Sequence, residues 1–257
     1  MKTKTIKCNF KNLQGETLDA RLDVPANIKI DEITDFIIFC HCFTCSKETI
    51  TTFRLSRLLA ENGYGVLRFD FTGLGNSEGD FSSSTFSSTQ DDLKNAIKFL
   101  EQNYRAPSFL MGHSLGGTTA LSVAQNYDFI KGVVTVASPS DPEHVLHHFG
   151  HALTLLEQGI NASFKVAGKY YDITPEFVED VRNANTKEVL SRLEKPALVF
   201  TVENDSMVNE TNAKEIQQWV KGETELVTLK NTDHLLSDRQ TSAEVAQRII
   251  TWLQNIR

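Results

Sequence analysis

The sequence predicts an α/β domain built on a twisted, mostly parallel sheet of about eight strands with flanking helices. Short apolar segments alternate with amphipathic ones along most of the chain, which is typical of strands joined by crossover helices. Several apolar segments are hydrophobic at consecutive positions, as expected for parallel strands buried on both faces. The length of 257 residues suits one such domain, so we expect residues 1–257 to form a single unit.

The first part of the chain predicts a hairpin and then two central strands separated by a helix. Residues 4–24 alternate apolar and polar side chains around a turn, and Pro25 ends the second strand. The apolar segments 36–40 and 65–69 predict parallel strands. The helix between them is expected over about 47–61, and its inward side chains are expected to be Ile50, Phe53, Leu58 and Leu59.

The same alternation continues to the C-terminus. A Ser/Thr-rich segment at 82–89 leads into a helix that carries Leu93, Ile97 and Leu100 at helical spacing. The later elements expected are strand 108–111, helix 115–124, strand 132–137, strand 196–202, a helix capped by Asn209, strand 224–229 and a closing helix with a capping box at 241–244.

Residues 138–194 interrupt this rhythm. They predict a helix at about 142–157, a short hairpin, and a second helix with Thr174 as its cap and Pro175 in its first turn. An insertion that follows a parallel strand would lie over the carboxyl ends of the sheet. We therefore interpret 138–194 as a lid insertion within the single domain.

The composition favours a globular protein that handles a small molecule. The net charge of −7 argues against nucleic acid or an anionic membrane as the main partner. The N-terminal segment lacks the apolar core of a signal peptide, and no window holds 18 apolar residues, so we expect no membrane insertion. These features predict a soluble, cytoplasmic protein and leave its oligomeric state open.

The chemistry is organised around Gly112-His113-Ser114-Leu115-Gly116. This G-x-S-x-G sequence lies between a predicted strand and a predicted helix, which is the setting of a nucleophile elbow. Glycine at 112 and 116 lets the strand and the helix pass closely, and Ser114 is expected in a strained conformation that exposes its hydroxyl. The helix that starts at Leu115 directs free N–H groups to the same point.

A serine hydroxyl needs a base within hydrogen-bond reach and a carboxylate that orients this base. The order expected for such a fold is Ser, then Asp or Glu, then His. His234, in the loop after strand 224–229, is the expected base. Asp205, just after strand 196–202, is the expected orienting acid.

Three further acidic residues lie in the same loops or near them. Glu203 is the alternative orienting acid, and Asp141 is a more distant one. We interpret Asp233 as a turn former rather than a member of the triad.

Hydrolysis through a tetrahedral intermediate also needs two backbone N–H donors for the oxyanion. Leu115, the residue after the serine, is expected to supply one. Phe43, in the loop after strand 36–40, is the candidate for the second. His41 is interpreted as a structural residue of this loop, with a role as a second base as the alternative.

These motifs resemble the α/β-hydrolase superfamily of serine hydrolases over essentially the whole chain. The segments HCFTCSK, VLRFDFTGLGNSEGDF, TFSST and GHSLGG are similar to those of small bacterial hydrolases that are sometimes fused to a domain of the osmotically inducible protein C type. We expect no such domain here, since the chain ends at Arg257. The resemblance implies the triad Ser114, Asp205 and His234 and the oxyanion donors Phe43 and Leu115.

Two positions depart from the superfamily pattern. Cys42 stands where the oxyanion loop usually has glycine, which puts the shape of the oxyanion hole in question. The loop that usually reads Asp-x-Arg-Gly-x-Gly-x-Ser has Thr72 in place of arginine.

The sequence thus predicts a serine hydrolase that forms an acyl-enzyme and uses no cofactor or metal. A carboxylesterase that acts on small or medium acyl esters is the central expectation, so the expected partner is a small-molecule acyl substrate. A thioesterase, an amidase or a peptidase would use the same residues. A ligand-binding or redox-responsive module on this fold is the alternative from another class, although a pure binder needs no complete triad.

Cys42 and Cys45 form a C-x-x-C pair, and Cys8 and Cys40 are the other two cysteines. Four cysteines in the first fifth of the chain do not form a disulfide scaffold, so we expect reduced thiols. Redox sensitivity of the oxyanion loop and a metal site are the alternatives. The pair lacks a thioredoxin-like context and a second pair of ligands.

His144, His147, His148 and His151 would share one face of the predicted helix 142–157. We interpret this face as a polar, partly exposed surface of the lid. A metal site and a pH-responsive lid are the alternatives.

Overall fold

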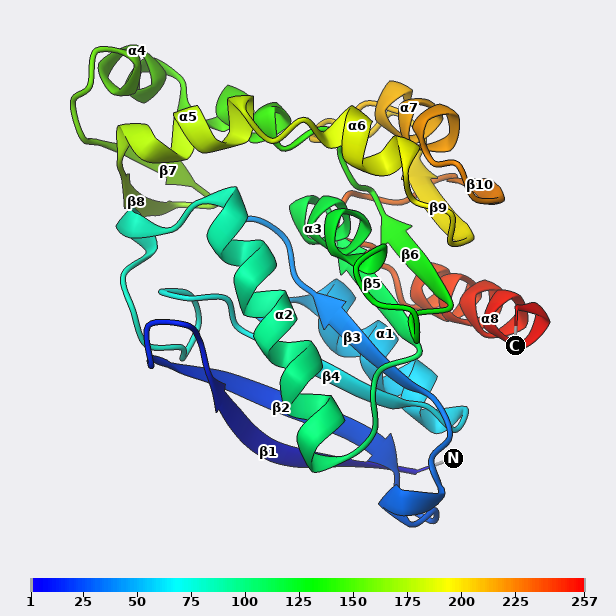
Figure 1. Cartoon of the computed structure of the whole chain (residues 1–257). Helices are drawn as coiled ribbons and strands as arrows, with labels where there is room; N and C mark the ends of the chain where they lie inside the picture. The colour runs from blue at the N-terminus through cyan, green and yellow to red at the C-terminus, as the bar shows by residue number, and fades with distance from the viewer. Residues whose placement is uncertain (1, 257) are drawn as a thin grey trace.

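An eight-stranded sheet is the frame of the protein in a computed structural model that describes residues 2–256 (Figure 1). The strand order is β1-β2-β4-β3-β5-β6-β9-β10. The strands are β1 (Thr3–Lys11), β2 (Thr17–Pro25), β3 (Phe36–Cys40), β4 (Gly65–Phe69), β5 (Phe109–His113), β6 (Gly132–Val136), β9 (Ala197–Val202) and β10 (Thr224–Leu229). The pairs β1–β2 and β2–β4 are antiparallel and the others parallel, which confirms the predicted sheet.

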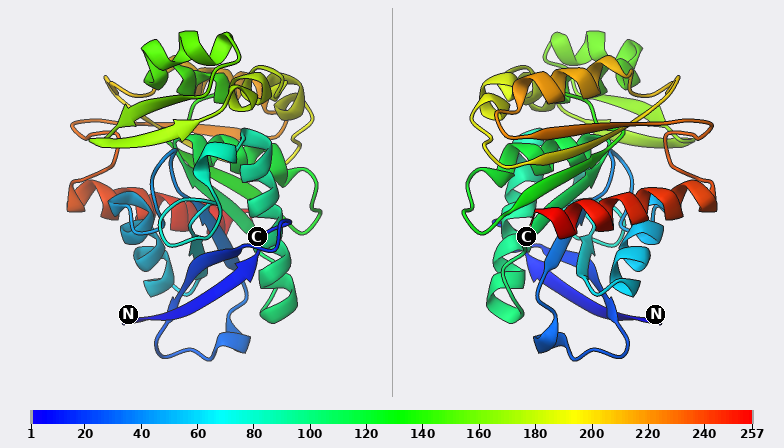
Figure 2. Two further views of the ribbon diagram at one scale, coloured as in Figure 1. Left: turned by 90° about the vertical axis from the view of Figure 1, so that its left-hand side faces the viewer. Right: turned by 90° about the vertical axis from the view of Figure 1, so that its right-hand side faces the viewer.

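Helices cover both faces of this sheet (Figures 1 and 2). One face carries α1 (Ile50–Glu61) and α8 (Arg239–Asn255). The other carries α2 (Phe86–Asn103), α3 (Leu115–Ala124), α6 (Thr186–Ser191) and α7 (Thr211–Trp219). The short 3-10 helices η1 (Ile30–Glu32) and η2 (Phe81–Ser83) lie in connections. No helix in residues 2–256 is both long and apolar enough to span a bilayer.

Residues 138–194, called the insertion below, form a layer beyond the carboxyl ends of the parallel strands (Figure 1). The elements of the insertion are η3 (Pro142–Phe149), α4 (His151–Glu157), β7 (Ala162–Val166), β8 (Lys169–Ile173), α5 (Pro175–Arg182) and α6. The predicted hairpin and the helix at Pro175 are present. The predicted single helix over 142–157 is wrong, because Gly150 at φ +52° separates a 3-10 segment from a short α-helix.

Three local predictions also need correction. α1 begins at Ile50, and Phe53 is 38% exposed because its ring lies 5.2 Å from the guanidinium of Arg68 instead of in the core. α8 begins at Arg239, where the Asp238 carboxylate accepts from the Thr241 amide, so 241–244 is not its cap. The aspartate cap competes with the predicted threonine cap because both side chains are good N-caps.

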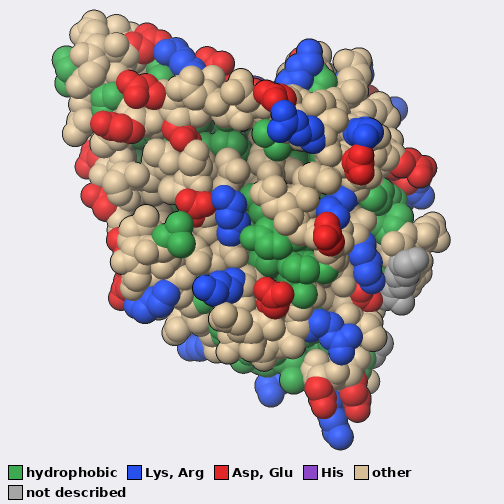
Figure 3. Space-filling view, in the orientation of Figure 1, with side chains coloured by type: hydrophobic (Ala, Val, Ile, Leu, Met, Phe, Trp, Pro, Cys, Tyr) green, Lys and Arg blue, Asp and Glu red, His purple; other side chains and the backbone are tan. Residues whose placement is uncertain are grey.

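Charged side chains of both signs are interspersed on the face shown in Figure 3. Phosphate backbones are bound by clusters of Lys and Arg. This face therefore offers no continuous basic surface for a nucleic acid.

Candidate active site

The five predicted site residues come after strands at one edge of the sheet. Phe43 follows β3, Ser114 and Leu115 follow β5, Asp205 follows β9, and His234 follows β10. These four strands are parallel, so their carboxyl ends meet at the same edge. Residues that are up to 191 positions apart, from 43 to 234, are thereby brought to one region.

Ser114 stands at the sharp turn between β5 and α3. Its backbone has φ +53° and ψ −131°, a conformation that side-chain-bearing residues rarely adopt, and its amide donates to the Val136 carbonyl at 2.9 Å. A Cβ on Gly112 would lie only 2.2 Å from the Gly116 carbonyl oxygen, so the turn requires glycine there. Within residues 2–256 the hydroxyl of Ser114 makes no hydrogen bond, which leaves it available to a substrate.

Asp205 and His234 are joined by a hydrogen bond of 2.8 Å between Oδ2 and Nδ1. The other carboxylate oxygen, Oδ1, accepts from the amides of Met207 at 2.8 Å and Val208 at 3.3 Å. Burial of Asp205 acts to raise its pKa, but these hydrogen bonds, led by the one from His234, hold the pKa below its ordinary value. The carboxylate therefore stays ionised and fixes the proton of His234 on Nδ1, which leaves Nε2 as the basic atom.

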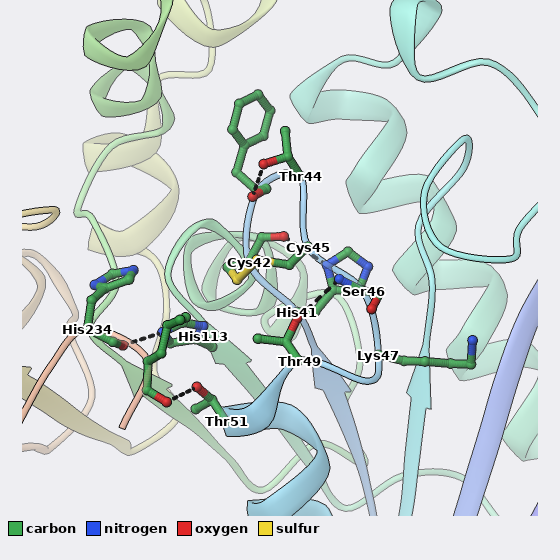
Figure 4. Close-up of a disulfide and its surroundings, with 12 residues drawn as sticks. His41, Cys42, Thr44, Cys45, Ser46, Lys47, Thr49, Thr51, His113 and His234 are labelled. Carbon is green, nitrogen blue, oxygen red and sulfur yellow. Dashed lines mark hydrogen bonds between the residues drawn. A yellow bond between two sulfur atoms is a disulfide. The ribbon is translucent and has the colours of Figure 1, made fainter. Parts of the chain in front are cut away.

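His113 holds the loop of His234 and was not predicted as a site residue. Its Nε2 donates to the main-chain oxygen of His234 at 2.8 Å, and its side chain is fully buried (Figure 4). Burial, together with the nearby imidazole of His234, lowers the pKa of His113 to about 3, so this ring stays neutral. The signal was within the G-x-S-x-G motif itself, because its second position is a histidine next to the serine.

The other three acidic residues considered for the triad have partners other than His234. Glu203 is 41% exposed and lies 3.9 Å from Lys230. Asp141 accepts from the amide of Glu143 at 2.9 Å and caps η3. Asp233 accepts from the amide of Ser237 at 2.8 Å within its own turn. Asp205 is therefore the acid that the fold brings to His234.

Two backbone N–H groups are free beside the serine. Within residues 2–256 the amides of Phe43 and Leu115 donate to no other group, and both residues line the same cavity. α3 approaches the Phe43 loop closely, since a Cβ on Gly116 would lie 2.4 Å from the His41 carbonyl oxygen. This close approach brings Phe43 and Leu115 to the same cavity.

The loop that carries Phe43 is closed by a disulfide between Cys42 and Cys45 (Figure 4). The expectation of reduced thiols at these two positions is therefore wrong, whereas Cys8 and Cys40 are free. Their Cα atoms are 5.2 Å apart, and the Cys45 amide donates to the Cys42 carbonyl at 3.1 Å. The positive φ falls at Thr44, at +58°, so Cys42 does not need the conformational freedom of the glycine it replaces.

His41 is a buried structural residue of this loop. Its Nδ1 donates to the Cys42 carbonyl at 2.8 Å, while its Nε2 accepts from the Phe71 amide at 3.2 Å. Burial lowers the pKa of His41, so the ring is neutral and both of its nitrogens are used. A role as a second base has no support in this geometry.

Lys47 anchors the same loop at its end. Its buried ammonium lies 2.6 Å from the Asp70 carboxylate, which also accepts from the Lys47 amide at 2.7 Å. Asp70 begins the loop in which Thr72 stands in place of arginine. The positive charge next to Asp70 therefore comes from Lys47.

The ring of Phe43 is the centre of an aromatic cluster that reaches into the insertion. It stacks on Phe164 of β7 at 5.8 Å between centroids and contacts Phe149, Phe177 and Phe81 at 5.5 to 6.2 Å. The Tyr171 hydroxyl of β8 donates to the Thr44 carbonyl at 3.0 Å. The insertion and the Phe43 loop are thus packed as one unit.

A small cavity of about 20 Å³ is lined by both Phe43 and Leu115. Its walls come from the Phe43 loop, the Asp70 loop, α2, α3 and α5. The apolar side chains that line the cavity include Phe43, Phe71, Leu74, Phe81, Leu115 and Phe177. The surface that these groups offer is apolar, as in pockets that take hydrocarbon groups.

The histidines of the insertion do not share one helix face. His144, His147 and His148 lie in η3 with ring centroids 4.6 and 3.8 Å apart, whereas His151 lies in α4 beyond the break at Gly150. His144 donates to the Met207 carbonyl at 2.8 Å, which supports the loop of Asp205. In the described part of the chain, no three His, Cys, Asp or Glu side chains are grouped to hold a metal ion.

Residues 32–255 match the family described as serine aminopeptidase, S33. A thermostable monoacylglycerol lipase of Bacillus sp. (strain H-257) is 27% identical over 208 residues, covering 77% of this chain and 82% of the lipase. The esterase domain of a Rhodothermus marinus protein is 34% identical, with a TM-score of 0.78 and 99% of both chains covered. Est1E from Butyrivibrio proteoclasticus, solved with ferulic acid bound, has a TM-score of 0.79 over 96% of this chain and 98% of its own, at 20% identity.

Proposed function

Because the chain belongs to the α/β-hydrolase family described as serine aminopeptidase, S33, we propose that it is a carboxylesterase that cleaves small or medium acyl esters through Ser114, His234 and Asp205. The predicted α/β-hydrolase fold is confirmed. The observation that carries the proposal is the 2.8 Å hydrogen bond between Asp205 and His234, in a loop that His113 ties to β5, the strand just before Ser114. The names of the similar proteins, a lipase and an esterase domain, favour an ester substrate.

In the proposed reaction, the Ser114 hydroxyl attacks the ester carbonyl and His234 Nε2 takes its proton. Asp205 stabilises the imidazolium that forms. His234 then gives the proton to the departing alcohol, which leaves an acyl group on Ser114. A water molecule, deprotonated by His234 in the same way, releases the acid and restores the serine.

The negative oxygen of each tetrahedral intermediate would be bound by the N–H groups of Phe43 and Leu115. Such donors are effective because they are already fixed in place before the charge develops. Neither amide is used elsewhere in residues 2–256, which supports this role.

The acyl group of the substrate would occupy the apolar cavity beside these two amides. The apolar walls favour an acyl chain, but the cavity holds only about 20 Å³, far less than typical small-molecule pockets of about 300–1,000 Å³, so we propose that its aromatic walls move apart when a small or medium acyl chain enters. The insertion contributes Phe177 to its wall, and we propose that residues 138–194 act as a lid. We also propose, from the HCFTCSK motif, that the chain belongs to the subgroup of hydrolases that are sometimes fused to a domain of the osmotically inducible protein C type.

A fluorophosphonate probe tests this function directly. We expect it to label the wild type and not Ser114→Ala, while Ser206→Ala, a change of an exposed serine beside Asp205, remains labelled. Absence of labelling in the wild type would favour a binding module. Hydrolysis of p-nitrophenyl esters of increasing chain length, with matched thioesters and anilides, then separates an esterase from a thioesterase or an amidase.

A further inference from the structure

We propose that the Cys42–Cys45 disulfide is a thiol–disulfide exchange site at which a dithiol reductant lowers the turnover of the enzyme by loosening the peptide that carries the Phe43 N–H. The inference rests on the proposed function, because that function assigns the Phe43 amide to the oxyanion. It concerns a modification that neither the motif nor the family assigns.

The Cys42 carbonyl and the Phe43 N–H belong to the same planar peptide unit and point in opposite directions. The direction of the N–H is therefore fixed by whatever holds the carbonyl oxygen. Two donors hold it, namely His41 Nδ1 at 2.8 Å and the Cys45 amide at 3.1 Å. One of these donors belongs to a residue of the disulfide, so the position of Cys45 bears directly on the oxyanion site.

The disulfide closes a four-residue turn that has an unfavourable backbone. Thr44 has φ +58°, a left-handed conformation that is unfavourable for a residue with a side chain. The covalent link between Cys42 and Cys45 spans the same four residues and opposes relaxation of Thr44. After reduction, the turn keeps its hydrogen bonds, namely those of the Cys45 amide, of His41, of Tyr171 and of the Thr44 hydroxyl to the Phe43 carbonyl. The ring of Phe43 also stays packed in the aromatic cluster, so we expect the peptide to loosen without the loop unfolding.

The two sulfur atoms differ in access. Cys42 is 5% exposed, whereas Cys45 is only partly buried, so a reductant reaches Cys45 first. A thiolate of the reductant attacks Cys45 Sγ, and the disulfide bond breaks as Cys42 leaves as a thiolate and takes a proton from solvent. The second thiolate of the reductant then displaces Cys45. The reductant loses two electrons and becomes a disulfide, and the protein gains two thiols.

The other two cysteines do not compete for this exchange. Burial raises the pKa of the Cys8 thiol to about 11, and it raises the pKa of the fully buried Cys40 thiol as well. Both remain protonated and therefore unreactive near neutral pH. Cys8 provides a matched control because it is a cysteine outside the site.

The experiment measures the redox state and the activity in the same samples. Full-length protein is purified in air and titrated with dithiothreitol, and each sample is alkylated after denaturation and weighed by mass spectrometry. Two of the four cysteines are expected to be alkylated before reduction and all four after it. For a p-nitrophenyl ester, kcat is expected to fall about tenfold with little change in KM, since loosening a donor costs less than the 10²–10³ lost on its removal.

Two variants complete the test. Cys45→Ser is expected to have the kcat of the reduced wild type and to ignore dithiothreitol, whereas Cys8→Ser behaves as the wild type. Reoxidation with glutathione disulfide restores the wild-type kcat. Thermal unfolding of each sample separates loss of the active site from loss of the fold. If Cys45→Ser does not fold, the dithiothreitol titration of the wild type alone tests the inference.

The inference is overturned if all four cysteines are alkylated without a reductant, if the disulfide resists dithiothreitol, or if kcat is unchanged once mass spectrometry shows it open. Failure of the proposed function has a different signature. In that case oxidised protein neither reacts with the fluorophosphonate probe nor hydrolyses esters, whatever its thiol count.

Discussion

The imidazole of His113 donates a hydrogen bond of 2.8 Å to the main-chain oxygen of His234, and the two rings lie 4.8 Å apart. The residue before the proposed nucleophile thus holds the loop of the proposed base. His113 ends β5, a fully buried central strand. The position of His234 therefore depends on a buried central strand of the sheet.

Replacement of His113 by leucine is expected to lower kcat between about 10- and 100-fold, since small misplacements of a catalytic group are costly. The buried carbonyl of His234 would lose its donor, at a cost of about 1–3 kcal/mol in the free energy of unfolding. Ester hydrolysis and urea denaturation measure the two effects. His113→Gln, which keeps an N–H donor, should retain more of kcat, and equal losses in both variants would contradict this role.

Asp205→Asn is expected to reduce kcat about 10⁴-fold with little effect on KM, because an amide favours the wrong tautomer of His234. The matched control is Glu203→Gln, which neutralises an exposed carboxylate in the same loop and should leave kcat unchanged. Steady-state kinetics of both variants on the same ester measure the two changes in kcat. A large loss in Glu203→Gln with a small one in Asp205→Asn would exchange the roles of these two acids.

The stability of the protein should fall as the pH is lowered from about 6.5 towards 3. In this range the unfolded chain binds a proton at His113, whereas the folded chain does not, because burial lowers the pKa of this group from 6.5 to about 3. Folding then excludes a proton, and the free energy of unfolding decreases by up to about 1.4 kcal/mol per pH unit. The depressed pKa of Asp205 adds to the loss at lower pH, where its carboxylate becomes protonated.

Urea denaturation at several pH values measures this slope. In His113→Gln the slope of unfolding free energy against pH should be shallower, since the variant has no group to titrate at this position. The control is His151→Gln, which removes an exposed histidine of α4 and should leave the slope as it is. The explanation fails if the slope is the same in all three proteins.

Tyr171→Phe is expected to lower the free energy of unfolding by about 0.5–1.5 kcal/mol and to reduce kcat, because the Thr44 carbonyl loses its donor from the insertion. Tyr170→Phe makes the same chemical change one residue earlier, on a side chain that is 72% exposed, and should have no effect. Urea denaturation and ester hydrolysis compare the pair. Identical behaviour of the two variants would show that the contact with the Phe43 loop is unimportant.

The strands and the site loops could be predicted because their signals are local. Continuous apolar segments such as 36–40 and 132–136 are too hydrophobic to lie anywhere but in the centre of a sheet. Ser114 and Asp205 come soon after such segments, and His234 comes soon after the half-buried edge strand β10, so the fold brings their loops together at one edge. The pairing of Asp205 with His234 followed from this placement, whereas Glu203 points to solvent.

The remaining features depend on contacts that sequence patterns do not contain. Phe53 has the spacing of a core residue, yet it lies on the surface beside Arg68, which reaches it from β4. The cap of α8 is Asp238 because the helix begins at Arg239, so the cap lies before the position that the threonine pattern suggested. The disulfide requires Cys42 and Cys45 to lie across a turn whose left-handed residue, Thr44, is not glycine, and no rule of composition predicts such a turn.

The insertion leaves the sheet after β6 and returns at β9, and these two strands are direct neighbours, with Val133 opposite Ala197. Its two stems therefore emerge side by side from a part of the sheet whose pairing does not involve the inserted residues. Segments of different length or sequence can be exchanged at this point while the strand register beneath them is preserved. The proposed lid and the scaffold beneath it are consequently free to evolve along separate routes in this molecule.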